Sequence, residues 1–233
     1  MIAGLQKMTL LDYPGKVACT VFLQGCNFRC PFCHNSQMLT GRPAATMETE
    51  AFFDFLRSRK GLLDGVCVSG GEPTLRPELP EFLTRIKALG FSVKLDTNGS
   101  HPEILKDLLS RGLVDYVAMD AKNCPRLYAE TVGTEVNLTA IEESLRFLMT
   151  DDRNYELRTT LVEPLHDAAS IAEMGRWMAH LVPGKKPRQL FLQSFVDRET
   201  VLFSGLSAPN AEQIAQYADI LSPFVESVQI RGK

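Results

Sequence analysis

The strongest chemical signal in the sequence is a group of cysteines in one short stretch. Cys26, Cys30 and Cys33 fall within eight residues, with three residues between the first two and two between the last two. Thiolates spaced in this way can hold three corners of a cubane iron–sulfur cluster. The fourth iron would then have no protein ligand, so it would be open to a substrate or cofactor.

A structural zinc site is the alternative for these cysteines, and it usually needs a fourth Cys or His ligand. His34 directly follows Cys33, which is an awkward position from which to complete the same tetrahedron. The other cysteines are scattered singly, at Cys19, Cys67 and Cys124. Clustered cysteines in a chain of this length are also not typical of a disulfide framework. The spacing therefore favours a cluster.

Three further segments combine glycines or charges in a way that suits ligand binding. Gly70 and Gly71 let the backbone approach a ligand closely, and Glu72 can attract an ammonium group. The other two segments are 96–99, which begins with Asp96 and Thr97, and 119–122, which contains Asp120 and Lys122. Read singly, these segments would be a tight turn, a strand-end cap and a surface ion pair.

The elements that must position these residues alternate between strand and helix. Short apolar runs predict strands at 17–24, 65–69, 91–96, 114–120, 155–162, 189–195 and 227–231. Helical periodicity predicts helices at 48–59, 77–89, 101–110, 138–149, 168–181 and 211–221, with Thr46, Asn137 and Asn210 as candidate caps. The segments 123–136, 183–188 and 197–209 are predicted to be loops.

Alternating strands and helices indicate an α/β fold with a parallel sheet. About six units are too few for a closed eight-unit barrel, so we expect a partial (β/α)6 TIM-like barrel, formed by a single domain over residues 1–233, with the cysteine loop after its first strand. All four candidate segments follow strands, so they should meet at the carboxyl edge of the sheet. His166 and Arg158 are weaker candidates there.

Composition places limits on the function. The 233 residues are 45% hydrophobic and carry a net charge of −3, which argues against direct nucleic-acid binding. No apolar run approaches the ~20 residues that span a bilayer, and the first residues lack the features of a signal peptide. We therefore expect a cytoplasmic protein.

The motifs together resemble a known family. The spacing of Cys26, Cys30 and Cys33, followed by the Gly-Gly-Glu-Pro run at 70–73, is similar to the radical S-adenosylmethionine superfamily. The segments 12–16, 24–31, 94–99, 115–120 and 157–160 resemble the activating proteins of anaerobic ribonucleoside-triphosphate reductase, which are glycyl-radical-enzyme activases.

This resemblance implies cofactors and roles. The three cysteines would hold a 4Fe–4S cluster whose open iron binds S-adenosylmethionine. The remaining cofactor contacts would be Phe32, His34, Gly70, Gly71, Glu72, Asp96, Thr97, Asp120 and Lys122. Phe32 has simple packing as its alternative. No catalytic side chain beyond these is implied.

The resemblance also implies partners: a glycyl-radical enzyme, with the anaerobic reductase favoured, and a flavodoxin or ferredoxin-type electron donor. Three alternatives stay open, namely an activase for another enzyme such as pyruvate formate-lyase, a radical enzyme acting on a small molecule, and a structural zinc or electron-transfer protein.

Overall fold

The computed structural model describes residues 2–39, 47–201 and 203–231. The chain has an α/β fold whose strands follow the sheet order β1 to β8. The strands are β1 Ile2–Thr9, β2 Ala18–Leu23, β3 Gly65–Gly70, β4 Ser92–Thr97, β5 Tyr116–Asp120, β6 Asn154–Leu161, β7 Gln189–Ser194 and β8 Ser227–Arg231. The α-helices are α1 Thr49–Ser58, α2 Leu79–Ala88, α3 Pro102–Ser110, α4 Pro125–Val132, α5 Leu138–Thr150, α6 Ala168–Leu181 and α7 Ala211–Leu221.

The predicted α/β class is confirmed, and each predicted strand and helix is present with small shifts at its ends. Asn137 and Asn210 cap α5 and α7 as expected, each accepting a bond from a backbone amide three residues later. Helix α1 is capped at Glu48 without a side-chain bond, and the candidate cap Thr46 lies outside the described residues.

Two elements differ from the sequence-based expectation. β1 was not predicted; it pairs antiparallel with β2. The segment 123–136, expected to be a loop, contains α4. This helix has Pro125 in its first turn and ends at Gly133, which has a left-handed backbone. Proline at the start and glycine after the end are ordinary helix boundaries, so the helix was missed because it is short.

The chain divides into two compact units. Unit 1 comprises Met1–Asn27, Gln37–Thr97 and Glu103–Ala118, and unit 2 comprises Phe28–Ser36, Asn98–Pro102 and Met119–Lys233. Cys26 therefore belongs to unit 1, whereas Cys30 and Cys33 belong to unit 2.

Unit 1 is built on β1 to β4. β2, β3 and β4 are parallel, and all their apolar residues except the partly exposed Phe22 are buried, as is usual for parallel strands covered on both faces. Leu23 at the end of β2 pairs with Gly70 at the end of β3, so the segments after these two strands start side by side. Helix α2 packs on β4.

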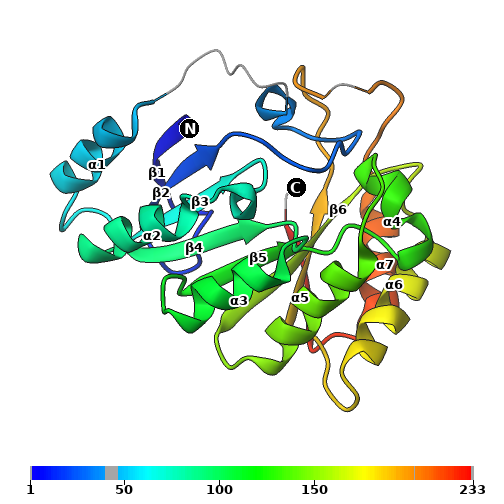
Figure 1. Ribbon diagram of the computed structural model, residues 1–233. Coiled ribbons are helices and arrows are strands. Elements are labelled where there is room, and N and C mark those ends of the chain that lie inside the picture. Colours follow the sequence, from blue (N-terminus) through cyan, green and yellow to red (C-terminus); the bar gives the residue numbers. More distant parts are fainter. Residues whose placement is uncertain (1, 40–46, 202, 232–233) are drawn as a thin grey trace. The chain divides into compact units, whose positions relative to one another are not determined.

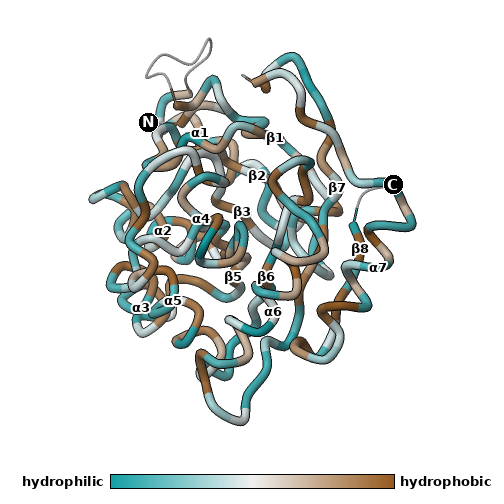
Figure 2. Tube along the Cα trace, turned by 90° about the vertical axis from the view of Figure 1, so that its right-hand side faces the viewer, coloured by the Kyte–Doolittle hydropathy of each residue, from teal (hydrophilic) through white to brown (hydrophobic). Residues whose placement is uncertain are grey.

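Unit 2 contains the parallel strands β6, β7 and β8. Helix α6 contacts α4, α5 and α7, and α7 packs on β7 and β8 (Figure 1). Hydrophobic and hydrophilic residues alternate along these helices (Figure 2), as expected for helices with one buried face. Among the described residues, no helix is long and apolar enough to cross a membrane.

Candidate active site

In unit 1, the backbone that leads into Cys26 is held from two sides. The Arg76 guanidinium donates from Nε and Nη2 to the Gln24 carbonyl, at 3.0 and 2.6 Å. The Gly25 amide donates to the Met38 carbonyl at 3.1 Å. These three hydrogen bonds fix the direction in which the chain leaves β2. Sequence reasoning missed Arg76, and nothing in the residue pattern marks its distant backbone partner.

The Gly70 and Gly71 turn packs directly on this backbone. The Gly71 amide donates to the Leu23 carbonyl at 2.9 Å, and the Glu72 amide donates to the Gly25 carbonyl at 2.8 Å. Gly70 has a φ of +120°, which favours glycine. A Cβ on Gly71 would lie well inside van der Waals distance of the Gly25 carbonyl. Both glycines are therefore required for the close approach of β3's loop to the end of β2.

Glu72 is almost completely buried, with 1% of its surface exposed. Its Oε1 accepts three hydrogen bonds: from the Thr74 amide at 3.0 Å, the Thr74 hydroxyl at 2.6 Å and the Thr97 hydroxyl at 2.8 Å. The carboxylate therefore ties the loop after β3 to the end of β4. This places Glu72 and Thr97 together, as predicted, and gives Glu72 a structural task beside its predicted contact with an ammonium group.

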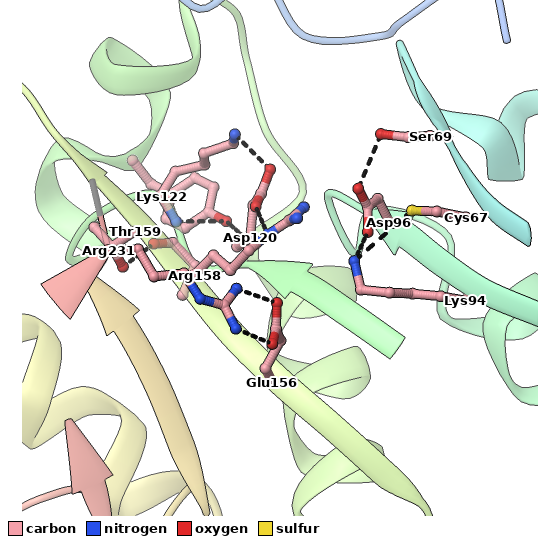
Figure 3. A network of polar contacts seen from close by, with 12 residues as sticks. Cys67, Ser69, Lys94, Asp96, Asp120, Lys122, Glu156, Arg158, Thr159 and Arg231 are labelled. Atoms are coloured by element: carbon pink, nitrogen blue, oxygen red, sulfur yellow. Dashed lines mark hydrogen bonds and ion pairs between the residues drawn. The ribbon is translucent and has the colours of Figure 1, made fainter. Parts of the chain in front are cut away.

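Asp96 belongs to a partly buried polar group on β3 and β4. It pairs with the ammonium of Lys94, which is 1% exposed, and accepts a bond from the Ser69 hydroxyl at 2.9 Å (Figure 3). The Lys94 Nζ also lies 3.9 Å from the Cys67 sulfur. A buried lysine needs such partners. No role was predicted for Lys94. Its position as a charged residue within an apolar strand could have indicated a buried ion pair.

In unit 2, the cysteine loop makes a tight turn in which the Cys33 amide donates to the Cys30 carbonyl at 3.1 Å. Phe32, between them, is 5% exposed and packs in a cluster with Val162, Leu165 and Phe195. Burial raises the pKa of both thiols, and the Lys122 ammonium partly offsets that effect. Phe32 therefore packs in the core of unit 2, which was the simpler of the two interpretations of this residue.

Asp120 and Lys122 form an ion pair at the end of β5. Lys122 Nζ lies 2.8 Å from Asp120 Oδ2 and 5.8 Å from the centre of the Phe32 ring. Arg158 Nε donates to the other Asp120 oxygen at 3.0 Å (Figure 3). Burial disfavours the charge on Lys122, but Asp120 and Cys30 outweigh it and raise the pKa of Lys122. Arg158, a weaker candidate, is thus part of this group.

The backbone of Lys122 is fixed by two buried side chains. His166 is 2% exposed, and its Nε2 lies 2.8 Å from the Lys122 carbonyl. The Tyr128 hydroxyl accepts a bond from the Lys122 amide at 3.4 Å. Burial lowers the pKa of His166, which favours the neutral ring. Tyr128 was missed because α4, which carries it, was expected to be a loop.

His34 faces the segment after β7. Its Nε2 lies 2.7 Å from the Val196 carbonyl, and its ring stacks on Phe195 with centroids 5.7 Å apart. The predicted cofactor contact of His34 stays a prediction.

The donor set at Cys26, Cys30 and Cys33 fits the predicted cluster chemically. None of the three forms a disulfide, and each is partly exposed. The three-thiolate site itself stays a prediction, since the described residues contain no group of three His, Cys, Asp or Glu side chains arranged to hold a metal ion.

The convergence of all four strand ends likewise stays a prediction. Within unit 1, the structure brings together Gly70, Gly71 and Glu72 with Thr97 and the residues before Cys26. Within unit 2, it brings together Cys30 and Phe32 with Asp120 and Lys122.

Comparisons with known proteins agree with these observations. Residues 20–150 match the model of the radical SAM superfamily. Among curated proteins, "Putative glycyl-radical enzyme activating enzyme MJ1227" of Methanocaldococcus jannaschii is 31% identical over 99% of this chain and 95% of its own length. A pyruvate formate-lyase-activating enzyme of Clostridium pasteurianum is 34% identical over 52% of each chain.

Solved structures with similar folds include radical SAM enzymes built as partial TIM barrels, which agrees with the expected fold class. The structure of Streptococcus suis SuiB bound to S-adenosylmethionine covers 89% of this chain and 48% of its own, with a TM-score of 0.67 and 12% identity. That likeness shows the fold alone. From the family match and the full-length relative, we conclude that the chain belongs to the radical SAM superfamily, whose enzymes use a 4Fe–4S cluster and S-adenosylmethionine.

Proposed function

We propose that this radical SAM enzyme is an activase that generates a glycyl radical on a partner enzyme. The observation that supports the proposal most strongly is the similarity to the M. jannaschii protein, because it extends over nearly the whole of both chains and that relative is named as an activating enzyme. Two matched proteins of other classes align with only part of this chain. One is the PqqA peptide cyclase, which aligns with 46% of it.

In this proposal, Cys26, Cys30 and Cys33 hold the cluster. When bound there, the cluster and S-adenosylmethionine would supply one-electron reductive radical chemistry, able to remove a hydrogen atom from the partner's glycine. The chain's own residues bind and orient the cofactor. Gly70 and Gly71 allow close approach of the backbone.

The charged groups have distinct tasks. Lys122, beside Cys30, places a fixed positive charge next to a ligand thiolate. It can also attract the cofactor's carboxylate, while Asp120 can accept bonds from a ribose. Asp96 and Thr97 support the cofactor from the end of β4, and Phe32 and His34 belong to the cluster loop.

Anaerobic ribonucleoside-triphosphate reductase is the partner that we favour, because the segments quoted above resemble its activating proteins. Pyruvate formate-lyase is equally consistent with the relatives, since one that matches half of this chain is named for that activation. A flavodoxin or ferredoxin-type protein would supply the electron.

The test is anaerobic incubation of the reconstituted enzyme with a low-potential reductant, S-adenosylmethionine and each purified candidate partner in turn. We expect 5′-deoxyadenosine together with a glycyl-radical EPR doublet on the anaerobic reductase. A doublet on pyruvate formate-lyase alone would assign the alternative partner. Absence of 5′-deoxyadenosine under every reducing condition would contradict the enzymatic proposal as a whole.

A further inference from the structure

The segment that follows β7 is the part of unit 2 for which sequence reasoning found no motif. Residues 195–201, called the clasp below, lie against the cysteine loop Phe28–Ser36. The two are far apart in sequence: the partners His34 and Val196 are 162 positions apart. The fold therefore brings the clasp to the loop that carries Cys30 and Cys33.

Two side chains of the loop are bonded to backbone carbonyls of the clasp. His34 Nε2 lies 2.7 Å from the Val196 carbonyl, so this ring nitrogen carries the proton and donates it. The Ser36 hydroxyl donates to the Thr200 carbonyl. Both acceptors are main-chain atoms of the clasp, and the two donor side chains lie one and three residues after Cys33. The loop is thus tied down immediately after its last cysteine.

Apolar contacts also hold this loop. Phe32 and Phe195 are buried in one cluster, and Cys30 and Val201 pack against that cluster. The Phe195 ring also stacks on His34 at an interplanar angle of 27°. The clasp therefore contacts the loop from Cys30 to Ser36, a stretch that includes two of the three candidate ligands.

The clasp is itself anchored to the rest of unit 2. The Phe195 amide donates to the Leu161 carbonyl at 3.2 Å, at the end of β6. A turn inside the clasp is closed by the Val201 amide and the Arg198 carbonyl at 2.9 Å. Two irregular segments that contact only each other would not hold the cysteine loop in place. The clasp can do so because it is hydrogen-bonded to the end of β6.

We propose that the clasp pre-positions Cys30 and Cys33 for the cluster, and that His34 acts as a positioning residue through its bond to the Val196 carbonyl. The idea rests on the proposed cluster site. Ligand groups that are already ordered lose less conformational entropy on binding, so a metal group is held more tightly and released more slowly. His34 then acts through the backbone rather than by touching the cofactor.

The experiment uses the full chain in two states. In the metal-free protein, the rates at which iodoacetamide alkylates Cys30 and Cys33 are measured by peptide mass spectrometry. In the anaerobically reconstituted protein, iron and sulfide content and the half-time of cluster loss to a chelator are measured. The variants are His34→Ala, His34→Phe, His34→Gln and Ser36→Ala.

These variants separate the effect of the His34 N–H donor from the effect of its aromatic ring. His34→Phe keeps an aromatic ring to stack on Phe195 but loses the N–H donor, whereas His34→Gln keeps a donor. His180→Ala is the matched control, because that exposed histidine on α6 makes its hydrogen bond within its own helix, to the Arg176 carbonyl. Circular dichroism confirms that each variant is folded.

We expect His34→Ala, His34→Phe and Ser36→Ala to speed alkylation of both cysteines, and to shorten the half-time of cluster loss, by about three- to tenfold, the effect of one hydrogen bond. His34→Gln and His180→Ala should stay close to wild type.

Unchanged alkylation in His34→Ala and Ser36→Ala would overturn the proposal. So would a loss of S-adenosylmethionine affinity with unchanged alkylation and cluster retention, since His34 would then be a cofactor contact. The alkylation result stands even if no cluster binds, so failure of the proposed function is distinguishable.

Discussion

Glu72 illustrates how one side chain at this site serves both the fold and the chemistry. Its carboxylate is buried and accepts three hydrogen bonds from Thr74 and Thr97. Removing it leaves two hydroxyls and an amide without that acceptor. An unsatisfied buried donor costs about 1–3 kcal/mol. A Glu72 variant can therefore lose cofactor binding in two ways: through the missing contact between the carboxylate and the cofactor, or through a change in the loop after β3.

We expect Glu72→Ala to lower the free energy of unfolding of the metal-free protein by about 1–3 kcal/mol. Glu72→Gln, which keeps one amide oxygen as acceptor, should lose less. Urea unfolding followed by circular dichroism measures both, with exposed Glu81→Ala as the control. If Glu72→Ala left the unfolding midpoint unchanged and weakened only S-adenosylmethionine binding, the structural task assigned to Glu72 would be wrong.

His166 makes the stability of the metal-free protein depend on pH. Burial lowers its pKa in the folded chain, whereas in the unfolded chain it titrates near its ordinary value of about 6.5. As the pH falls below that value, the unfolded state therefore binds more protons than the folded state does. Stability contributed by the neutral ring is present above about pH 6.5 and is lost as the pH falls toward the lowered pKa.

We expect His166→Gln to flatten the fall in unfolding free energy between about pH 7.5 and 5.5. Glutamine can keep a hydrogen bond to the Lys122 carbonyl but does not titrate. Urea unfolding at several pH values compares the slopes of wild type, His166→Gln and the control His180→Gln. Equal slopes in wild type and His166→Gln would show that His166 is not the group responsible.

At the scale of elements, the end of β2 depends on the loop after β3. Gly71 sits against the Gly25 carbonyl, and the Glu72 amide donates to that same carbonyl. A side chain at position 71 must push this backbone away, and Cys26 is the next residue along. The effect of a single methyl group should therefore reach a candidate cluster ligand.

We expect Gly71→Ala to destabilise the protein by about 1–3 kcal/mol, the usual cost of overpacking, and to reduce iron incorporation. Gly4→Ala on β1 is the matched control, because its added Cβ would make an ordinary 3.6 Å contact with Phe22. Thermal unfolding and iron content after reconstitution are the measurements. A Gly71→Ala protein that unfolds and binds iron like wild type would contradict the close approach.

The strands and helices that position the site were predictable because their residues repeat with clear periods. β1 was not, since its burial does not alternate: Gln6, Lys7 and Met8 are all exposed. The roles of individual residues were harder. The partners of Arg76 and His34 are backbone carbonyls, at positions 24 and 196. The sequence pattern does not indicate which backbone carbonyl a side chain will bond to, so such contacts become visible only in the folded structure.

For the whole molecule, the exposure of the cysteines determines how the loaded enzyme should behave in air. Cys26, Cys30 and Cys33 are all partly exposed, and a cluster with one open iron must also admit S-adenosylmethionine. Solvent exposure and the sulfur environment set the potential of such clusters. A group that is both accessible and strongly reducing is open to oxygen.

We expect the anaerobically reconstituted protein to lose its visible absorption within minutes to an hour of exposure to air, with release of iron. Cys30→Ala should show little absorption before exposure, because one ligand is missing. Bound S-adenosylmethionine should slow the loss, since in the proposed site it would occupy the open iron. The absorption spectrum and iron content are followed with time, and buffer kept anaerobic serves as the control. A cluster that stayed intact in air for hours would contradict an exposed, low-potential site and would favour a closed structural one.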